Sequence, residues 1–459
     1  MIDNFLIYPT ALLILFLAVT FTVGKTWGGT VTNLLFADRS LKLASTGLAI
    51  NSHWFWAIAI FISPAVAYNW GIIGLLWFTI PNALSLVIVG MLANKFRKSH
   101  PDRFSFTEYV REKYGRSVSV LLYIMYTCIA FAGILLGFTA IFKFFSFLDI
   151  KNFIEPIYVV LFFGLITLLF SMKGGIRTSI FTGATQTILW LAFLSVMSFQ
   201  ILTSDLDFNL LTNGKNNLET VFNVPFLTGF AVSFLISILV GGTSHGMMWQ
   251  KSCSIPRENI IPSFTIAACL FGIMCFMMGS LGLFAQASGL TINSAETSQM
   301  ASILFLTGGA GLLVFGTLLI GQTATVVDSC LNYFSSINSI EWFGSDSVFF
   351  ARVSMFTFFI IAWLLTWLEL EVWTIFMLMS ALRITMFIPI VSMVNQIEFN
   401  TRLSSIILLI GVVGAVYLSL YARLNQLPIF NMYSSVFAII FGAGCMLVTY
   451  RYSKHKIKA

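Results

Sequence analysis

Thirteen long apolar segments, separated by short polar ones, constrain this chain more than any other feature of its sequence. They lie near residues 6–24, 46–69, 72–94, 118–147, 154–171, 178–203, 226–246, 260–288, 299–333, 348–367, 370–393, 403–422 and 428–450. A helix needs roughly 20 apolar residues to cross a bilayer, so each segment can make one crossing. Charged residues make up only 9% of the chain, against about 25% in soluble domains. The sequence therefore predicts an all-α polytopic membrane protein with about 13 transmembrane helices in a single domain, residues 1–459.

The basic residues of the loops predict how these helices are oriented. With the N-terminus outside, 19 Lys and Arg residues fall in inside loops and 3 in outside loops. The inside set is Lys25, Arg39, Lys42, Lys95, Arg97, Lys98, Arg103, Arg111, Lys113, Arg116, Lys173, Arg177, Lys251, Arg257, Arg402, Arg451, Lys454, Lys456 and Lys458. The outside set is Lys151, Lys215 and Arg423. By the positive-inside rule we expect a cytoplasmic C-terminus and a plasma-membrane location, which in a bacterium is the inner membrane.

Other classes of function find little support. The net charge of +7 follows from these loops, so we expect no nucleic-acid partner. The four histidines are scattered along the sequence, and it contains neither a CxxC pair nor a Gly-rich phosphate loop. We therefore expect no enzyme, no cofactor and no metal beyond a possible sodium ion. The oligomeric state is not determined by these patterns.

One inside segment, residues 101–116, mixes aromatic and charged side chains. Phe106, Tyr109, Val110 and Tyr114 alternate there with acidic and basic residues. This pattern predicts a short amphipathic helix on the membrane surface, with a solvated linker as the alternative.

Two apolar segments carry possible helix breaks. Ser63-Pro64 interrupts the second, because proline removes a backbone donor, and Gly241-Gly242 interrupts the seventh. Transporters with inverted repeats place broken helices at matching positions of their two halves, where the solute binds. The halves would be residues 46–203 and 226–393, after an extra helix at 6–24 and before C-terminal helices at 403–450. The alternative is that Pro64 only kinks its helix and the glycines form a close-packing surface.

Four motifs then suggest a family. FADRSL at 36–41, FSFTEYVREKYG at 104–115, GGIRTSIFTGATQ at 174–186 and TVVDSCLNYFSS at 325–336 resemble, in order, motifs of the sodium:solute symporters. The resemblance covers about residues 5 to 450. The stretch at 52–78, SHWFWAIAIFISPAVAYNWGIIGLLWF, and MWQ at 248–250 are similar to the urea-transporter branch. This resemblance implies a leucine-transporter-like fold with two inverted repeats of five helices, alternating access, and solute uptake driven by a cation gradient.

The resemblance also implies a place for a sodium ion between the first and eighth core helices. The positions that match its ligands are Ser52, Phe55, Gln322, Thr325 and Val326. Val326 offers no hydroxyl, and Gly183 stands where the family has an aspartate, so a proton is the alternative coupling ion. Asp328 and Ser329 follow, one turn inward, and Asp328 could help an ion to pass or exchange a proton itself. The alternative is that Asp328 is a solvated helix end.

Candidate solute-binding residues gather around the predicted breaks. They are Trp54, Trp56, Ser63, Gly241, Gly242, His245 and Arg383. A charge such as that of Arg383 should have a partner inside a membrane, and Glu369 or Glu371 lies in the same segment. Arg383 could bind a solute carboxylate, belong to a gate, or serve as a packing clamp. Because residues two apart face different sides of a helix, we expect at most one of Trp54 and Trp56 to line the pore.

The prediction is a cation-coupled secondary active symporter that imports a small polar organic solute through a lipid bilayer. Urea or another nitrogenous compound is favoured by the branch resemblance. The alternatives are an amino-acid or organic-acid symporter, or a non-transporting membrane sensor derived from the fold.

Overall fold

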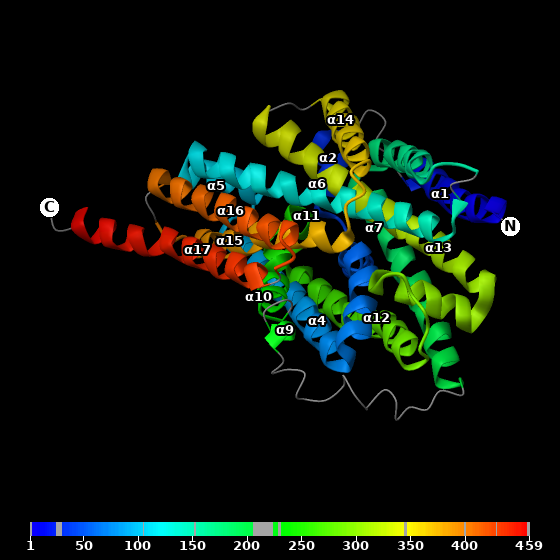
Figure 1. Ribbon diagram of the computed structural model, residues 1–459. Helices are drawn as coiled ribbons and strands as arrows, with labels where there is room; N and C mark the ends of the chain where they lie inside the picture. Colours follow the sequence, from blue (N-terminus) through cyan, green and yellow to red (C-terminus); the bar gives the residue numbers. More distant parts are fainter. Residues whose placement is uncertain are drawn as a thin grey trace.

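The fold consists of helices throughout the part of the chain that the computed structural model describes (Figure 1). The described residues are 2–23, 30–103, 105–150, 153–204, 224–227, 231–343, 347–398, 401–427 and 429–456. The helices are α1 (Ile2–Val23), α2 (Val31–Phe36), α3 (Leu43–Trp54), α4 (Ala57–Ser99), α5 (Phe106–Tyr114), α6 (Arg116–Phe147), α7 (Pro156–Leu202), α9 (Val224–Phe226), α10 (Val232–Gly241), α11 (Gly246–Cys253), α12 (Ile260–Ala287), α13 (Ser298–Ser336), α14 (Val348–Thr366), α15 (Val372–Val394), α16 (Thr401–Leu424) and α17 (Ile429–Lys456).

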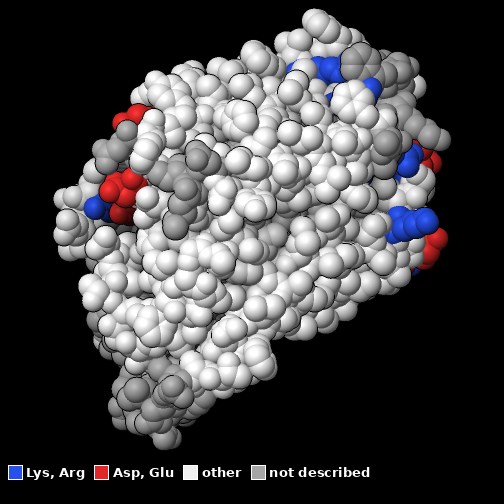
Figure 2. Space-filling view, turned by 90° about the vertical axis from the view of Figure 1, so that its right-hand side faces the viewer, with Lys and Arg blue, Asp and Glu red and all other residues white. Residues whose placement is uncertain are grey.

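The helices have the length and the surface of a membrane bundle. Nine of those described are long and apolar enough to cross a bilayer, and the bent pair α10–α11 makes a tenth. Figure 2 shows a broad face without charged side chains between two rims on which Lys, Arg, Asp and Glu gather. Such a band matches the hydrocarbon layer, in which charged side chains are costly.

Two of the nine helices are long enough for two crossings each. α4 has 43 residues and α7 has 47, about twice the roughly 20 residues of one crossing. Each is interrupted by a glycine with left-handed backbone, Gly71 (φ 64°) in α4 and Gly175 (φ 56°) in α7. Only glycine adopts such a conformation without steric cost. These breaks lie in the gaps between the predicted segments, and with α17 the described helices reach the expected thirteen crossings.

One predicted segment begins too early. The sequence predicts a single crossing near residues 299–333, but α13 is interrupted at Gly308, where φ is 64°. The residues before Gly308 therefore form a separate short helical piece, and the crossing itself follows it. Hydropathy does not reveal this division, because the residues on both sides of Gly308 are apolar.

The amphipathic helix predicted at 101–116 exists as α5, but its apolar face lies on the protein rather than on the membrane. Phe106 stacks on Trp249 with ring centroids 4.6 Å apart, and the Tyr109 hydroxyl donates to the carbonyl of Met393 at 3.2 Å. Both aromatic side chains are buried. The expectation of a surface helix is wrong because the neighbouring helix ends offer apolar contacts that the sequence alone does not show.

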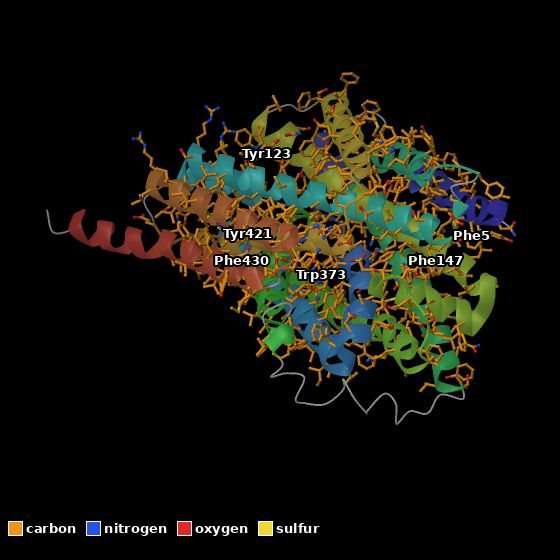
Figure 3. All side chains as sticks on the ribbon, viewed as in Figure 1. Phe5, Tyr123, Phe147, Trp373, Tyr421 and Phe430 are labelled. Carbon is orange, nitrogen blue, oxygen red and sulfur yellow. The ribbon has the colours of Figure 1, made fainter. Side chains whose placement is uncertain are left out.

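α3 lies at the centre of the bundle. It packs against α7, α12 and α13, and α12 runs along α4. α15, α16 and α17 pack together beside this core, where Tyr421 of α16 meets Phe430 of α17 with ring centroids 4.8 Å apart (Figure 3). The candidate site residues are therefore placed on central helices, away from the lipid-facing surface.

Candidate solute and ion sites

The first broken helix is the junction of α3 and α4. α3 ends at Trp54, Phe55 has φ −83° and ψ 60°, Trp56 is extended, and α4 begins at Ala57. The predicted break at Ser63-Pro64 is wrong, because both residues lie within the regular part of α4. The Ser63 hydroxyl donates to the carbonyl of Ala59 at 2.6 Å, inside its own helix. Proline omits one hydrogen bond of this helix but does not end it, because the backbone on both sides of Pro64 stays helical.

The second broken helix lies where the sequence predicts it. α10 ends at Gly241, residues 242–244 form a short 3-10 turn, His245 is extended, and α11 begins at Gly246 after a bend of 41°. Side chains of other helices hold the opened backbone. The Gly242 amide donates to Ser85 Oγ at 2.8 Å, and the carbonyl of Thr243 accepts from Trp249 Nε1 at 2.8 Å and from Tyr126 at 3.2 Å.

The two breaks meet in a set of four side chains, Trp54, Trp56, His245 and Arg383, which we call the central cluster. The His245 ring lies edge-on to both indoles, with centroid distances of 5.0 Å to Trp54 and 5.3 Å to Trp56. Arg383 Nη2 is 2.8 Å from His245 Nε2, and its guanidinium lies 5.8 Å from the Trp56 ring centroid. All four side chains are buried. Residues that are far apart in the sequence thus form one buried aromatic and cationic cluster.

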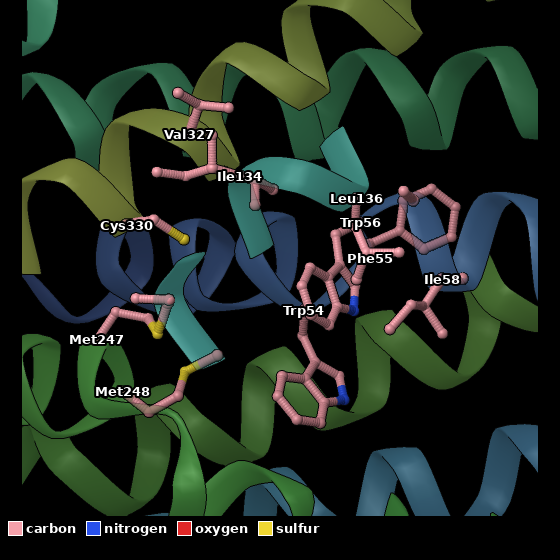
Figure 4. Packing of buried hydrophobic residues seen from close by; sticks show 14 of the residues in the cluster. Trp54, Phe55, Trp56, Ile58, Ile134, Leu136, Met247, Met248, Val327 and Cys330 are labelled. Carbon is pink, nitrogen blue, oxygen red and sulfur yellow. The ribbon is translucent and has the colours of Figure 1, made fainter. Parts of the chain in front are cut away.

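Trp54 and Trp56 both reach this cluster, whereas the sequence predicts that at most one of them lines the pore. Figure 4 shows the two indoles lying close together at the end of α3. That expectation assumes a continuous helix, and which of the two indoles lines the pore stays a prediction. Across the extended backbone at Trp56, residues two apart no longer point to different sides.

The glycines of the second break face different neighbours. A Cβ added to Gly241 would lie 3.5 Å from the Trp54 ring and 3.6 Å from Arg383 Cδ, so this glycine borders the central cluster. A Cβ added to Gly242 would lie 3.0 Å from the carbonyl oxygen of Ser85 on α4. The missing side chain of this glycine therefore allows α4 to pack closely against the second break. Ser63, by contrast, has no contact with the cluster among the interactions of the described residues.

Arg383 has no carboxylate partner among the described residues, so its expected partners are wrong. Glu371 instead pairs with Arg423 at 2.7 Å. Several polar atoms of the cluster also lack a hydrogen-bond partner in this part of the chain: Arg383 Nε, His245 Nδ1 and Trp54 Nε1. Because Arg383 donates to His245 Nε2, the proton of a neutral His245 lies on Nδ1. All three unpaired atoms are then donors, and the cluster suits a ligand that accepts hydrogen bonds.

The two approaches to the central cluster differ. A cavity of about 560 Å³ lies at the Glu371 end of the bundle, and Ala65, Asn69, Trp70, Trp373 and Met377 are among the residues that line it. Met377 is less than two turns before Arg383 on α15. On the opposite side Trp249, Phe106 and Tyr126 pack closely, and the space among them is about 10 Å³. The open cavity therefore lies at the Glu371 end, the close packing lies on the other side, and the four buried residues of the cluster line neither space.

The residues implied for a sodium ion come together, but as hydrogen-bond partners of one another. Gln322 Nε2 donates to the carbonyl of Ser52, and Ser52 Oγ donates to Gln322 Oε1 at 3.2 Å. Thr325 Oγ1 donates to the carbonyl of Gly321 at 3.1 Å, and Val326 has no oxygen to offer. A hard cation needs several oxygen ligands free to face it. The set offers one side-chain oxygen fewer than the resemblance implies, because Val326 has no hydroxyl, and sodium binding here stays a prediction.

Asp328 is fully buried, so the alternative of a solvated helix end is wrong. Its Oδ1 accepts from Asn332 Nδ2 at 2.8 Å, whereas its Oδ2 has no hydrogen-bond partner among the described residues. Ser329 beside it shares a hydrogen bond of 3.0 Å with Ser179 of α7. A buried carboxylate of this kind needs a nearby positive charge.

That charge comes from Lys251, which sequence reasoning counts as a loop residue. It belongs to α11, its side chain is 2% exposed, and its Nζ donates to the carbonyl of Ala49 at 3.2 Å. Its charge interacts with that of Asp328. Lys251 therefore does not count as evidence for the orientation of the helices. The excess of Lys and Arg in the other inside loops remains. Its place only five residues after the Gly246 break was the signal that could have revealed it.

Sequence reasoning also missed His53. The histidines are not all scattered, because the rings of His53 and His245 lie 6.2 Å apart across the two breaks. Neither ring nitrogen of His53 has a hydrogen-bond partner within the described ranges. No group of three metal-binding side chains forms in these ranges, and the pair packs beside the indoles of the central cluster.

The curated relatives of this chain are transporters. No family model matches the sequence. A urea-proton symporter, DUR3, of Oryza sativa subsp. japonica is 21% identical over 324 residues, which are 62% of this chain and 44% of that protein. A probable urea active transporter 3 of Schizosaccharomyces pombe is 23% identical over 330 residues, 66% of this chain and 48% of that protein. The chain spans about half the length of the curated relatives that it matches.

Solved structures match almost the whole chain. A Na+-coupled sialic acid symporter superposes with a TM-score of 0.69 at 16% identity and covers 96% of this chain and 98% of its own. Mhp1, a nucleobase-cation-symport-1 family transporter, has a TM-score of 0.61 at 13% identity, with coverages of 90% and 93%. Identities this low show the fold alone. The chain is an all-α polytopic membrane protein with the leucine-transporter fold.

Proposed function

We propose that this chain is a cation-coupled secondary active symporter of the sodium:solute symporter type, which imports a small polar organic solute by alternating access. The observation that carries the proposal is the meeting of two broken helices at the central cluster. Irregular backbone inside a membrane is tolerated where it is buried in protein or lines a solute pathway. A cavity at one end and closed aromatic packing at the other fit one state of such a cycle.

The chemistry of the central cluster favours a solute with a hydrogen-bond-accepting oxygen. Arg383, His245 and Trp54 present donors without partners in the described chain, and the two indoles supply flat apolar walls. A carbonyl oxygen such as that of urea satisfies these donors, and the planar molecule fits between aromatic rings. The curated relatives, which are named as urea transporters, support urea or another nitrogenous compound as the first choice.

An amino acid or organic acid is the second candidate solute. The observation in its favour is that the Arg383 guanidinium has no carboxylate partner among the described residues, so a solute carboxylate could pair with it. Solute competition separates the two candidates, because a carboxylate-specific site is inhibited by amino or organic acids and not by urea.

Uptake into proteoliposomes tests the proposal. Radiolabelled urea is supplied outside, with an imposed sodium gradient, an imposed proton gradient, or neither. Accumulation above the equilibrium level with one of the gradients supports a symporter. Equilibration at the same rate under all three conditions identifies a passive channel instead, and the absence of any flux for urea and the competing acids identifies a sensor.

The orientation proposed for this symporter places the N-terminus outside and the C-terminus in the cytoplasm. The support is the excess of Lys and Arg in the inside loops over the outside loops, which remains strong when Lys251 is not counted. The two helical halves are proposed at about residues 46–203 and 226–393. Reporter fusions after Asn213 and after Ala459 check the orientation, and finding both reporters on one side contradicts it.

A further inference from the structure

Lys251 is the buried charge to which the proposed function gives no role. α11 carries it into the bundle, where its ammonium donates to the carbonyl of Ala49 on α3. A lysine is almost never fully buried unless its charge is compensated. Its surroundings should therefore show what compensates it.

The charged and titratable groups around Lys251 come from two other helices. Asp328 and Cys330 of α13 and His53 of α3 are close enough to interact with its charge. Asp328 is the acidic side chain among them, but its carboxylate is not in direct contact with the ammonium in the described structure. Asp328 Oδ2 remains without a hydrogen-bond partner there. The ammonium is thus held by a backbone carbonyl and by the field of a nearby carboxylate.

The position of the ammonium is close to the one implied for sodium. Ala49 lies three residues before Ser52 on α3, and Asp328 lies three residues after Thr325 on α13. The ammonium is therefore between the same two helices, about one turn away along both. The oxygens implied as sodium ligands are meanwhile engaged by Gln322 and Gly321.

We propose that the Lys251 ammonium is the resident cation between α3 and α13, tethered to the protein in place of a free sodium ion. The inference rests on the proposed function in one respect only. If the chain is a symporter, its uptake does not use a sodium ion at this position. Lys251 ties α11 to α3 through its hydrogen bond to the Ala49 carbonyl, and it interacts with α13 through the charge of Asp328. A second cation entering between these helices is repelled by the ammonium.

The experiment measures sodium binding without transport. The purified full chain and its variants are heated in detergent, with NaCl titrated against choline chloride at constant ionic strength. The parent is expected to show no sodium-specific shift of Tm. Lys251→Ala removes the ammonium, leaves the Ala49 carbonyl without its donor and the Asp328 charge without compensation, and is expected to gain a sodium-specific rise of about 2 °C. Asp328→Asn added to this variant should abolish the gain.

Two further variants keep the test decisive. Lys251→Gln retains an N–H donor for the Ala49 carbonyl and removes only the charge. It should therefore gain the same sodium response, and it replaces Lys251→Ala in the test if that variant does not fold. Arg97→Met is the matched control, because Arg97 is a buried base that donates to the carbonyl of Cys253 at 3.0 Å, outside the space between α3 and α13. It should not respond to sodium.

Three results overturn the proposal. One is a sodium-specific rise of Tm in the parent. Another is a folded Lys251→Ala or Lys251→Gln variant that does not respond to sodium, and the third is a response that survives Asp328→Asn. Because no solute flux enters this measurement, its failure leaves the proposed symport untouched, and a failure of uptake in proteoliposomes leaves the sodium result untouched.

Discussion

Two buried cations, Arg383 and Lys251, lie near the helix breaks in opposite electrostatic situations. Arg383 has an imidazole and aromatic rings beside it and no carboxylate partner in the described chain, and donors of its cluster lack partners. Lys251 has the carbonyl of Ala49 and the charge of Asp328. A buried charge whose partner is missing is ready to bind a ligand, whereas a compensated one serves the structure. The comparison supports the proposals of ligand binding for Arg383 and helix packing for Lys251.

The largest effect is expected at Arg383. Arg383→Leu should lower uptake about 10- to 100-fold, because a hydrogen bond to a charged group contributes about 1.5–3 kcal/mol. Its Tm should stay within about 2 °C of the parent or rise, because no carboxylate is left unpaired. Initial uptake rates and thermal melting are measured together.

Arg103→Leu is the control for this prediction, since the pairs of Arg103 with Glu108 and Glu112 lie at the surface and do not line the cavity beside Glu371. It should change uptake less than threefold, as exposed ion pairs contribute roughly 0–1 kcal/mol. If Arg383→Leu loses stability and keeps uptake, Arg383 serves packing, and the contrast between the two cations is wrong.

The next effect concerns the glycine that borders Arg383. Gly241→Ala should be tolerated, because a Cβ there meets Trp54 and Arg383 at ordinary contact distances. Gly241→Leu fills the space beside Trp54 and Arg383 and should lower uptake about tenfold or more while the protein still inserts into the membrane. Uptake is normalised to the amount of folded protein in the membrane.

Gly242 gives the contrasting case. Even Gly242→Ala places a Cβ 3.0 Å from a backbone oxygen of α4, so it should lower Tm more than Gly241→Ala does. Equal behaviour of the two alanine variants would show that the central cluster does not border Gly241.

A smaller effect, on stability, is expected at the compensated cation. Asp328→Asn removes the nearest carboxylate from Lys251 and should lower the free energy of unfolding by about 1–3 kcal/mol. Adding Lys251→Met should restore most of the loss, because no unpaired charge then remains buried. Thermal melting of the parent and of the two variants measures the loss and its recovery. Ser329→Ala is the matched neutral control. An Asp328→Asn variant as stable as the parent would show that Lys251 does not depend on this carboxylate.

The smallest effect is expected at Val326. Val326→Ser adds a hydroxyl next to Thr325, but with Lys251 in place the sodium response should change less than twofold. In the Lys251→Ala background the same hydroxyl should strengthen sodium binding, because it supplies one more oxygen ligand. Sodium titrations of Tm in both backgrounds measure the difference. A strong sodium response of Val326→Ser alone would place the resident cation elsewhere.

Sequence alone determined that this chain is a thirteen-crossing helical membrane protein, where most of its crossings are separated or broken, though not the interruption at Gly308, and which polar residues are candidates for binding. These properties are local, because hydropathy is summed over one crossing and glycine acts on its own backbone. The breaks at Gly71, Gly175 and Gly241 illustrate this. The break at Phe55 and Trp56 was not predicted, because neither of these two residues disrupts a helix by itself.

Only the tertiary structure decided which residues meet. Arg383 and His245 are 138 residues apart, and Ser52 and Gln322 are 270 apart, so no local pattern could pair them. Lys251 looked like a loop charge because its burial depends on α3 and α13, which come from other parts of the chain. The free energy of a buried charge depends on its partners in space, and it is the packing of distant helices that provides or withholds those partners.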